Sequence, residues 1–234
     1  MGALSESLVL AAGLVTHFDA HLVDIVLLSL RVSFTATLIA AVIGLPLGAA
    51  IAVGRFAGRP ALIVMLNAMM GLPPVVVGLV VYLLLSRAGP LGTFGLLFTP
   101  GAMIIAQTIL ITPIIAALTR QIVADAWGEY REQLTSLGAG TLRAAMTLLW
   151  DTRFSLATVM LAGFGRAIAE VGAVMIVGGN IAGVTRVMTT TIALETSKGD
   201  LPLALALGLV LIAIVVLLNA LAQLTREWAK ARFG

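Results

Sequence analysis

LPLALALGLVLIAIVVLLNALAQLT, residues 201–225, is a run without a single charged side chain. A helix that crosses a membrane needs about 20 mostly apolar residues, so this stretch alone predicts a membrane-spanning helix. The composition agrees, because 60% of the 234 residues are hydrophobic and only 11% are charged. So few charges cannot cover a surface that faces water, which excludes an ordinary soluble domain.

Three further uncharged runs are long enough to cross a membrane, at residues 32–53, 61–86 and 101–119. Another stretch, residues 154–185, is equally apolar but contains two charged residues. Counting it, we predict an all-α, polytopic membrane protein with one transmembrane domain over residues 1–234. Its five expected spans lie at about residues 25–54, 61–86, 101–120, 154–180 and 201–225.

Lysine and arginine residues fall unequally on the two sides of these spans. Nine lie on the side that includes the C-terminal segment, and four lie on the other side. Because cytoplasmic loops are enriched in such cations, we expect the C-terminus and the loop of residues 121–153 in the cytoplasm and the N-terminus outside. Cations spread this widely form no basic stripe, so we expect the lipid bilayer, and no nucleic acid, around the chain.

Several kinds of chemistry are excluded because the sequence lacks the residue types or motifs that they need. The chain has no cysteine, and neither Lys198 nor Lys230 stands in the Gly-Lys-Ser/Thr pattern of a phosphate-binding loop. His17 and His21 have the spacing of a helical metal-binding pair, but even with Asp24 nearby a convincing third ligand is missing. We therefore expect no enzyme active site, no metal site and no cofactor.

The loop of residues 121–153 is patterned. Residues 129–137 predict a short helix, two glycines end it, and residues 141–149 predict a second helix. Helix connections usually take about 2–8 residues, so this loop favours docking to a partner over a solvated connector. The residues of the pattern are Tyr130, Leu134 and Leu137, then Gly138 and Gly140, then Thr141 as a cap before Leu142, Ala145, Leu148 and Leu149.

Gly71-Leu72-Pro73-Pro74 falls in the middle of the predicted span 61–86. Proline removes a backbone hydrogen bond and disturbs a helix, and helices broken inside a membrane often line a solute site. A half-helix that begins here would present N–H donors and a positive dipole end to an anion. A simple proline kink, packed by neighbouring helices, is the equal alternative for Pro73 and Pro74.

Arg166 and Glu170 are four residues apart, so on a helix they share a face and can pair. Gly165, Ala169 and Ala173 form a series of small residues that would let another helix approach closely. A charge at this depth usually faces a bundle interior or a cavity, which favours a water-accessible path for a charged solute. A buried ion pair that only fixes packing is the equal alternative.

The loop resembles a known family. Residues 132–138, Glu-Gln-Leu-Thr-Ser-Leu-Gly, resemble the cytoplasmic loop of ABC importer permeases. Glu132, Leu137, Gly138 and Leu148 match its pattern, whereas its two alanines and its terminal Leu-Pro are absent. In that family the first short helix sits in a cleft of the ATPase subunit.

The stretch 165–180, GRAIAEVGAVMIVGGN, is similar to the permeases of oxyanion importers for molybdate, tungstate and sulfate. With residues 186–191 and 195–200 included, the strongest resemblance is to the tungstate type. The resemblance extends over about residues 22–224. It implies the five-helix type I permease fold, a homodimer in the cell inner membrane, two ATPase subunits, and a periplasmic or extracellular oxyanion-binding protein.

The resemblance also implies ATP-driven uptake of tungstate or molybdate by alternating access. The expected ATPase-coupling residues are Glu129, Tyr130, Glu132, Leu134, Leu137 and Gly138, and the expected pathway residues are Pro73, Pro74, Arg166, Glu170, Asn180, Thr189, Thr190 and Thr191. Asn180 and the threonines would supply neutral donors for a tetrahedral dianion, with a solvated outer loop as the alternative. Two rival functions remain: an ATP-independent channel or ion-coupled carrier that uses Arg166 and Glu170, and a membrane anchor for a cytoplasmic enzyme.

Overall fold

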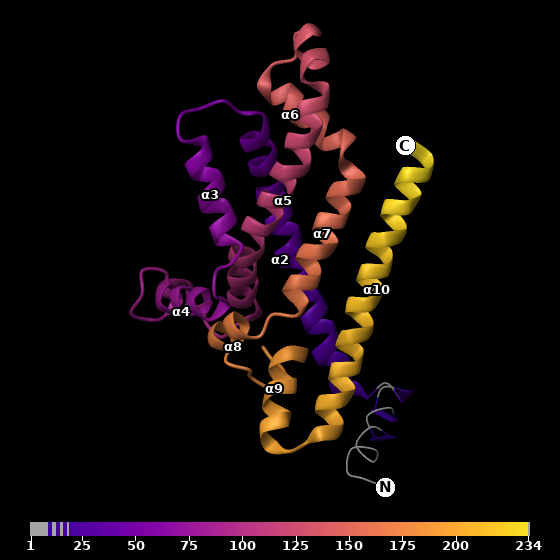
Figure 1. The fold of residues 1–234 in the computed structure, drawn as a ribbon. Helices are drawn as coiled ribbons and strands as arrows, with labels where there is room; N and C mark the ends of the chain where they lie inside the picture. The colour runs from indigo at the N-terminus through magenta and orange to yellow at the C-terminus, as the bar shows by residue number, and fades with distance from the viewer. Residues whose placement is uncertain (1–8, 11–12, 15, 18, 234) are drawn as a thin grey trace. The chain divides into compact units, whose positions relative to one another are not determined.

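Helices make up every regular element in the part of the chain that is described, residues 9–233 without 11, 12, 15 and 18, in a computed structural model (Figure 1). Residues 1–8, which include part of the N-terminal segment predicted to lie outside, are not among the described residues. The helices are α2 (Ala20–Val53), α3 (Arg59–Met69), α4 (Pro74–Leu85), α5 (Pro100–Ser136), α6 (Thr141–Asp151), α7 (Arg153–Ile168), α8 (Gly172–Gly178), α9 (Met188–Lys198) and α10 (Leu201–Phe233).

Three helices are long and apolar enough to cross a membrane by themselves: α2, α5 and the Leu201–Thr225 part of α10. They coincide with three of the five predicted spans. The other two predicted spans, 61–86 and 154–180, are each two helices joined by a bend. The described chain therefore has three candidate crossings, or five if each bent pair is one span. Large apolar side chains are exposed along α2, α4 and α10, as expected for helices in contact with lipid.

The bend between α3 and α4 is 97°. Pro73 directly precedes α4 and Pro74 is its first residue, so the predicted proline break is confirmed. The first helical position suits proline, because the N–H that proline lacks would have no partner within the helix.

The bend between α7 and α8 is 58° and falls at residues 169–171, which contain no proline. Because α7 ends at Ile168, the predicted row of small residues Gly165, Ala169 and Ala173 does not lie along one helix, and that prediction is wrong. A backbone that leaves helical geometry at this point needs other hydrogen-bond partners for the groups it frees.

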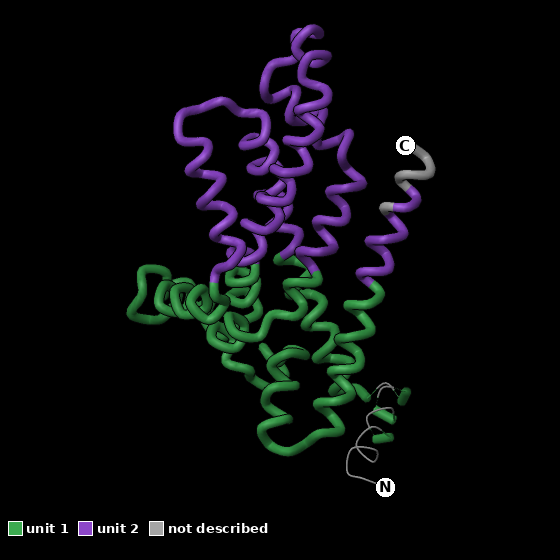
Figure 2. The backbone as a smooth tube through the Cα atoms, viewed as in Figure 1, with its two compact units in different colours: residues 1–36, 73–107, 165–217 green, residues 37–72, 108–164, 218–234 purple. Residues whose placement is uncertain are grey.

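The described chain divides into two compact units (Figure 2). Unit 1 comprises residues 1–36, 73–107 and 165–217, and unit 2 comprises residues 37–72, 108–164 and 218–234. Each unit is assembled from segments that are far apart in the sequence.

In unit 1, the short helices α4 and α8 pack closely. A Cβ atom on Gly78 of α4 would lie 2.8 Å from the Cα atom of Ala173 in α8, so only glycine allows this approach. The backbone N–H of Phe98 donates to the carbonyl of Val177 at 3.0 Å and ties the segment before α5 to α8.

In unit 2, α2 and α5 cross closely at Gly48, where a Cβ atom would lie 2.5 Å from the carbonyl oxygen of Ala116. Arg59 donates hydrogen bonds to the carbonyls of Ile51 and Ala52, at 2.8 and 3.1 Å, and so satisfies the last turn of α2. The inner side of α6 completes a small core with residues of α2 and α5. This core consists of Ala49, Ala52, Val53, Val123, Ala144, Ala145 and Leu148.

Candidate functional site

Glu170 lies in the break between α7 and α8, and its side chain is only 4% exposed. The Arg166 guanidinium donates to Glu170 Oε2 at 2.6 Å, which confirms the predicted pairing. The backbone N–H of Ala173 donates to Glu170 Oε1 at 3.3 Å. The Arg166 side chain is 40% exposed, so one partner of this ion pair is buried while the other reaches the surface of unit 1.

Two side chains from other helices satisfy the carbonyls at this break. Gln107 of α5 donates its Nε2 hydrogen to the Ala167 carbonyl at 2.9 Å. Thr189 of α9 donates its hydroxyl to the Glu170 carbonyl at 2.7 Å. Gln107, Thr189 and residues 167–171 all belong to unit 1, so side-chain contacts within that unit hold the broken backbone.

The start of α4 lies against the same break. A Cβ atom on Gly172 would be 2.9 Å from Val75 Cγ2, and Val75 directly follows Pro74. The structure thus places four of the predicted pathway residues close together in unit 1: Pro74, Arg166, Glu170 and Thr189.

Pro73 directly precedes Pro74 at the start of α4, and the other three predicted pathway residues form a second group beside the first. Thr190 and Thr191 are fully buried in the first turns of α9, and Thr191 donates its hydroxyl to the Val187 carbonyl at 2.7 Å. Asn180, in a left-handed conformation with φ of 50°, donates its Nδ2 hydrogen to the Thr190 carbonyl at 3.3 Å. The threonines are therefore part of a buried helix, and their interpretation as a solvated outer loop is wrong.

A small cavity adjoins the break in unit 1. Its volume is about 10 Å³. Its lining residues are Ser29, Val32, Ser33, Gln107, Ile168, Glu170, Val187 and Thr189. Sequence reasoning missed Gln107, Ser29 and Ser33. Two features of the sequence could have indicated them. Gln107 is an amide inside the uncharged run 101–119, and Ser29 and Ser33 are polar residues one helical turn apart.

The predicted docking loop forms an elbow between α5 and α6. Its first short helix is not a separate element, because α5 continues without interruption to Ser136. Gly138 then turns the chain with a φ of 71°, while the Ala139 N–H donates back to the Leu134 carbonyl at 2.9 Å. The predicted Thr141 cap is wrong, since Gly140 occupies the cap position and no side chain caps α6.

The elbow exposes large apolar side chains. Leu137, Leu142, Met146 and Trp150 are 64–77% exposed, and the last three follow one face of α6 at four-residue spacing. Leu142 thus lies on the outer face of α6 rather than beside Ala145 and Leu148 as predicted. Among the other predicted coupling residues, Glu129, Tyr130, Glu132 and Gly138 are exposed and Leu134 is half-buried against the core of unit 2.

Tyr130 lies in the last part of α5, after the end of the predicted membrane span 101–120. The negative charge of Glu129, followed by that of Asp151, raises the pKa of the Tyr130 hydroxyl above its ordinary value. The hydroxyl therefore stays protonated at physiological pH and can donate a hydrogen bond to a docked partner.

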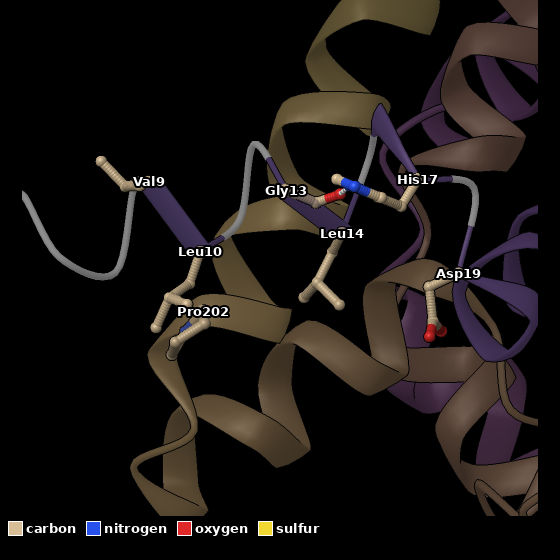
Figure 3. A pocket seen from close by; sticks show the side chains of 7 residues that line it. All are labelled: Val9, Leu10, Gly13, Leu14, His17, Asp19 and Pro202. Atoms are coloured by element: carbon tan, nitrogen blue, oxygen red, sulfur yellow. Dashed lines mark hydrogen bonds between the residues drawn. The ribbon is translucent and has the colours of Figure 1, made fainter.

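A larger pocket of about 540 Å³ lies beside the start of α10 and is mostly apolar (Figure 3). His17 lines it, but a ring nitrogen of His17 is held by the Gly13 carbonyl at 2.9 Å. Among the described residues there is no group of three His, Cys, Asp or Glu side chains that could hold a metal ion.

Comparison with known proteins gives the family. The tungstate uptake system permease protein TupB of Peptoclostridium acidaminophilum is 43% identical over 227 residues, which cover 97% of this chain and 100% of that protein. The chain belongs to the permease subunits of oxyanion ABC transporters. No protein-family model matches this permease.

Other relatives of the permease carry related names. A probable anion ABC transporter permease protein of Haloferax volcanii is 41% identical, with 92% of the permease and 94% of that protein covered. The molybdenum transport system permease protein ModB of Mycobacterium tuberculosis is 27% identical, with 82% and 76% covered. Family membership and the candidate spans together make the permease a multi-pass membrane protein of anion transport.

Proposed function

We propose that the permease is the membrane-spanning subunit of an ATP-driven importer that carries tungstate or molybdate by alternating access. The observation that carries this proposal is the 43% identity, over the full length of the relative, to a permease of a tungstate uptake system. The more distant molybdenum and sulfate relatives support an oxyanion as the substrate, but they do not indicate which oxyanion is carried.

Energy would come from a separate ATPase subunit. The permease has no phosphate-binding loop of its own, and the α5–α6 elbow offers an exposed apolar surface for a partner. We place two ATPase copies on the elbows of a homodimer. The residues of each docking surface are Glu129, Tyr130, Glu132, Leu134, Leu137 and Gly138, joined by Leu142, Met146 and Trp150.

The charge distribution and the family support the rest of the arrangement. We place residues 121–153 and the C-terminus in the cytoplasm and the N-terminus outside, with the two bent pairs each counted as one span of a five-span domain. The complex would lie in the cell inner membrane and receive its oxyanion from a periplasmic or extracellular binding protein.

The translocation pathway is proposed to run beside the α7–α8 break. Arg166 offers a partly exposed guanidinium to an oxyanion, while Glu170 holds that guanidinium in place. The N-terminus of α4, which begins at Pro74, adds the positive end of a helix dipole nearby. Pro73 and Pro74 have no N–H to donate, and the N–H groups of Val76 and Val77 donate to the Pro73 carbonyl. Asn180, Thr189, Thr190 and Thr191 would shape the wall of the pathway, since their side chains hydrogen-bond to backbone groups that fix their positions.

Uptake into proteoliposomes tests the function. The permease is reconstituted with its candidate ATPase and binding protein, and entry of tungstate, molybdate and sulfate is followed with and without internal ATP. Uptake that requires ATP and all three components supports the proposal. Uptake without ATP would establish the channel or carrier instead, and ATPase binding without any anion uptake would establish the membrane anchor.

The docking surface has its own test at the glycine elbow. Gly138→Ala forces a side chain into a positive φ, whereas the matched control Gly140→Ala enters open space at a φ of −70°. We expect Gly138→Ala to reduce ATP-driven uptake at least fivefold through weaker ATPase association, and Gly140→Ala to retain it. Equal activity of both variants would show that the elbow geometry does not transmit the energy of ATP.

A further inference from the structure

The cavity beside the α7–α8 break holds an unsatisfied polar atom. Gln107 is 3% exposed, and its Oε1 atom is buried without a hydrogen-bond partner. The orientation of the amide is fixed, because Nε2 must face the Ala167 carbonyl at 2.9 Å. Oε1 therefore remains an acceptor, and a buried acceptor without a donor is costly.

The lining of the cavity offers further acceptors. The Ser29 hydroxyl donates to the Ile25 carbonyl at 2.7 Å, and the Thr189 hydroxyl donates to the Glu170 carbonyl at 2.7 Å. Both hydroxyl hydrogens are thus committed to the backbone. The Ser29 oxygen also accepts from the Met188 N–H at 2.8 Å, and each hydroxyl oxygen still has a lone pair that can accept a hydrogen bond. The Glu170 residue, with its carboxylate, also lines the cavity. An occupant of this space must mainly donate hydrogen bonds.

We propose that this cavity binds one water molecule, which donates to Gln107 Oε1 and to a second lining oxygen. A volume of about 10 Å³ matches the roughly 10–15 Å³ that one water needs, and the site supplies the polar partners that a buried water requires. The bound water links Gln107 of α5 to the element that carries the second oxygen, beside the broken backbone. It acts as a positioning group for the break that carries Glu170.

Two other occupants fit the cavity less well. A tetrahedral oxyanion is larger than a water molecule and would face acceptor oxygens. A sodium ion would find oxygen ligands, but the only carboxylate in the lining is already neutralised by Arg166 at 2.6 Å. A water molecule therefore fits the cavity best, and the inference holds whichever anion is carried.

An experimental map of the assembled transporter, at a resolution where ordered waters are visible, tests the proposal directly. We expect a density peak about 2.7–3.2 Å from Gln107 Oε1. An empty cavity in such a map would overturn the proposal.

A double-mutant cycle in the purified complex gives an independent test. Val187 lines the cavity and is 5% exposed, so Val187→Ile fills the space and expels the water. We expect the unfolding midpoint to fall by about 2–8 °C, because Gln107 Oε1 loses its donor. In a Gln107→Met background, which has no such acceptor, the additional fall should shrink by at least half.

The alternative explanations predict different changes in the unfolding midpoint. A dry cavity predicts an unchanged or raised midpoint for Val187→Ile, and simple overpacking predicts the same loss in both backgrounds. Val174→Ile, in a buried position of α8 away from the cavity lining, is the control that should show no coupling to Gln107→Met. If the unfolding midpoint is higher in sodium chloride than in choline chloride, and only when Gln107 is present, the cavity binds a sodium ion and the water proposal is wrong.

Discussion

The permease breaks its helices at two places, and the two breaks are held by different means. At residues 70–72 the freed N–H groups bond to carbonyls three residues earlier in the same chain, at 3.1–3.2 Å, and Pro74 has no N–H to satisfy. At residues 169–171 the carbonyls of Ala167 and Glu170 instead take partners from α5 and α9. The first break is held by local backbone bonds, whereas the second combines one such bond, from the Glu170 N–H to the Ala167 carbonyl at 3.1 Å, with side-chain donors from other helices.

This difference indicates where the protein is sensitive to mutation. A break closed by its own backbone survives the loss of one side chain. A break closed by side chains of other helices loses stability with each of them, and it is also the kind of element that can have two arrangements during transport. The second break is therefore the better candidate for a moving part in alternating access.

The largest expected effect comes from Glu170→Gln. It leaves the Arg166 guanidinium without its carboxylate at the break, and removing one partner of a buried pair costs about 3–5 kcal/mol. We expect less, about 2 kcal/mol, because Arg166 is 40% exposed and can be partly hydrated, together with at least a tenfold loss of uptake. Chemical unfolding of the purified permease and vesicle uptake measure the two effects.

Glu195→Gln is the matched control. Glu195 is a buried carboxylate of α9 that pairs with Lys198 at 3.0 Å, away from both breaks. We expect a loss below about 1 kcal/mol, because Lys198 is 53% exposed and can be hydrated instead. Equal losses in the two variants would show that the break has no special dependence on its ion pair.

Gln107→Leu should have the next largest effect. The Ala167 carbonyl loses its side-chain donor at 2.9 Å but keeps the Glu170 N–H at 3.1 Å, so we expect the loss of one buried hydrogen bond, about 1–1.5 kcal/mol. Thr112→Val, in the same helix, removes a hydroxyl that bonds only to the carbonyl of Thr108, and should cost well under 1 kcal/mol. If the control is as destabilising as Gln107→Leu in chemical unfolding, α5 does not hold the break.

Thr189→Val should cost about 1 kcal/mol, because it removes the bond from α9 to the Glu170 carbonyl without changing side-chain shape. Thr191→Val provides a close comparison, since its equally buried hydroxyl bonds within α9 to the Val187 carbonyl. We expect its unfolding free energy to change less and its uptake to stay near that of the unchanged protein. The opposite order would contradict the role of Thr189 at the break.

Pro73→Ala should have the smallest effect, below about 1 kcal/mol, acting mainly through the unfolded chain. Pro74 still begins α4 and the turn at residues 70–72 keeps its backbone bonds. Retained uptake and an almost unchanged unfolding free energy would sharpen the contrast with Glu170→Gln. A loss as large as that of Glu170→Gln would remove the distinction between a local and a tertiary break.

Much of this protein follows from local chemistry. Long uncharged runs predict the helices α2, α5 and α10, because lipid is the only solvent that accepts them. Two adjacent prolines predict the first break, and the four-residue spacing of Arg166 and Glu170 predicts their pairing. These features depend on residues close together in the chain, so their spacing in the sequence is sufficient to find them.

Only the tertiary structure decided the rest. The break after Ile168 takes hydrogen bonds from Gln107 and Thr189, which lie at least 18 residues away from it and offer no local sign of their partners. The close contact of Gly78 with Ala173, rather than a row of small residues along one helix, is likewise a meeting of distant segments. Hydrogen bonds and packing between elements have no period in the sequence, and for that reason the second break and its cavity became visible only in the folded chain.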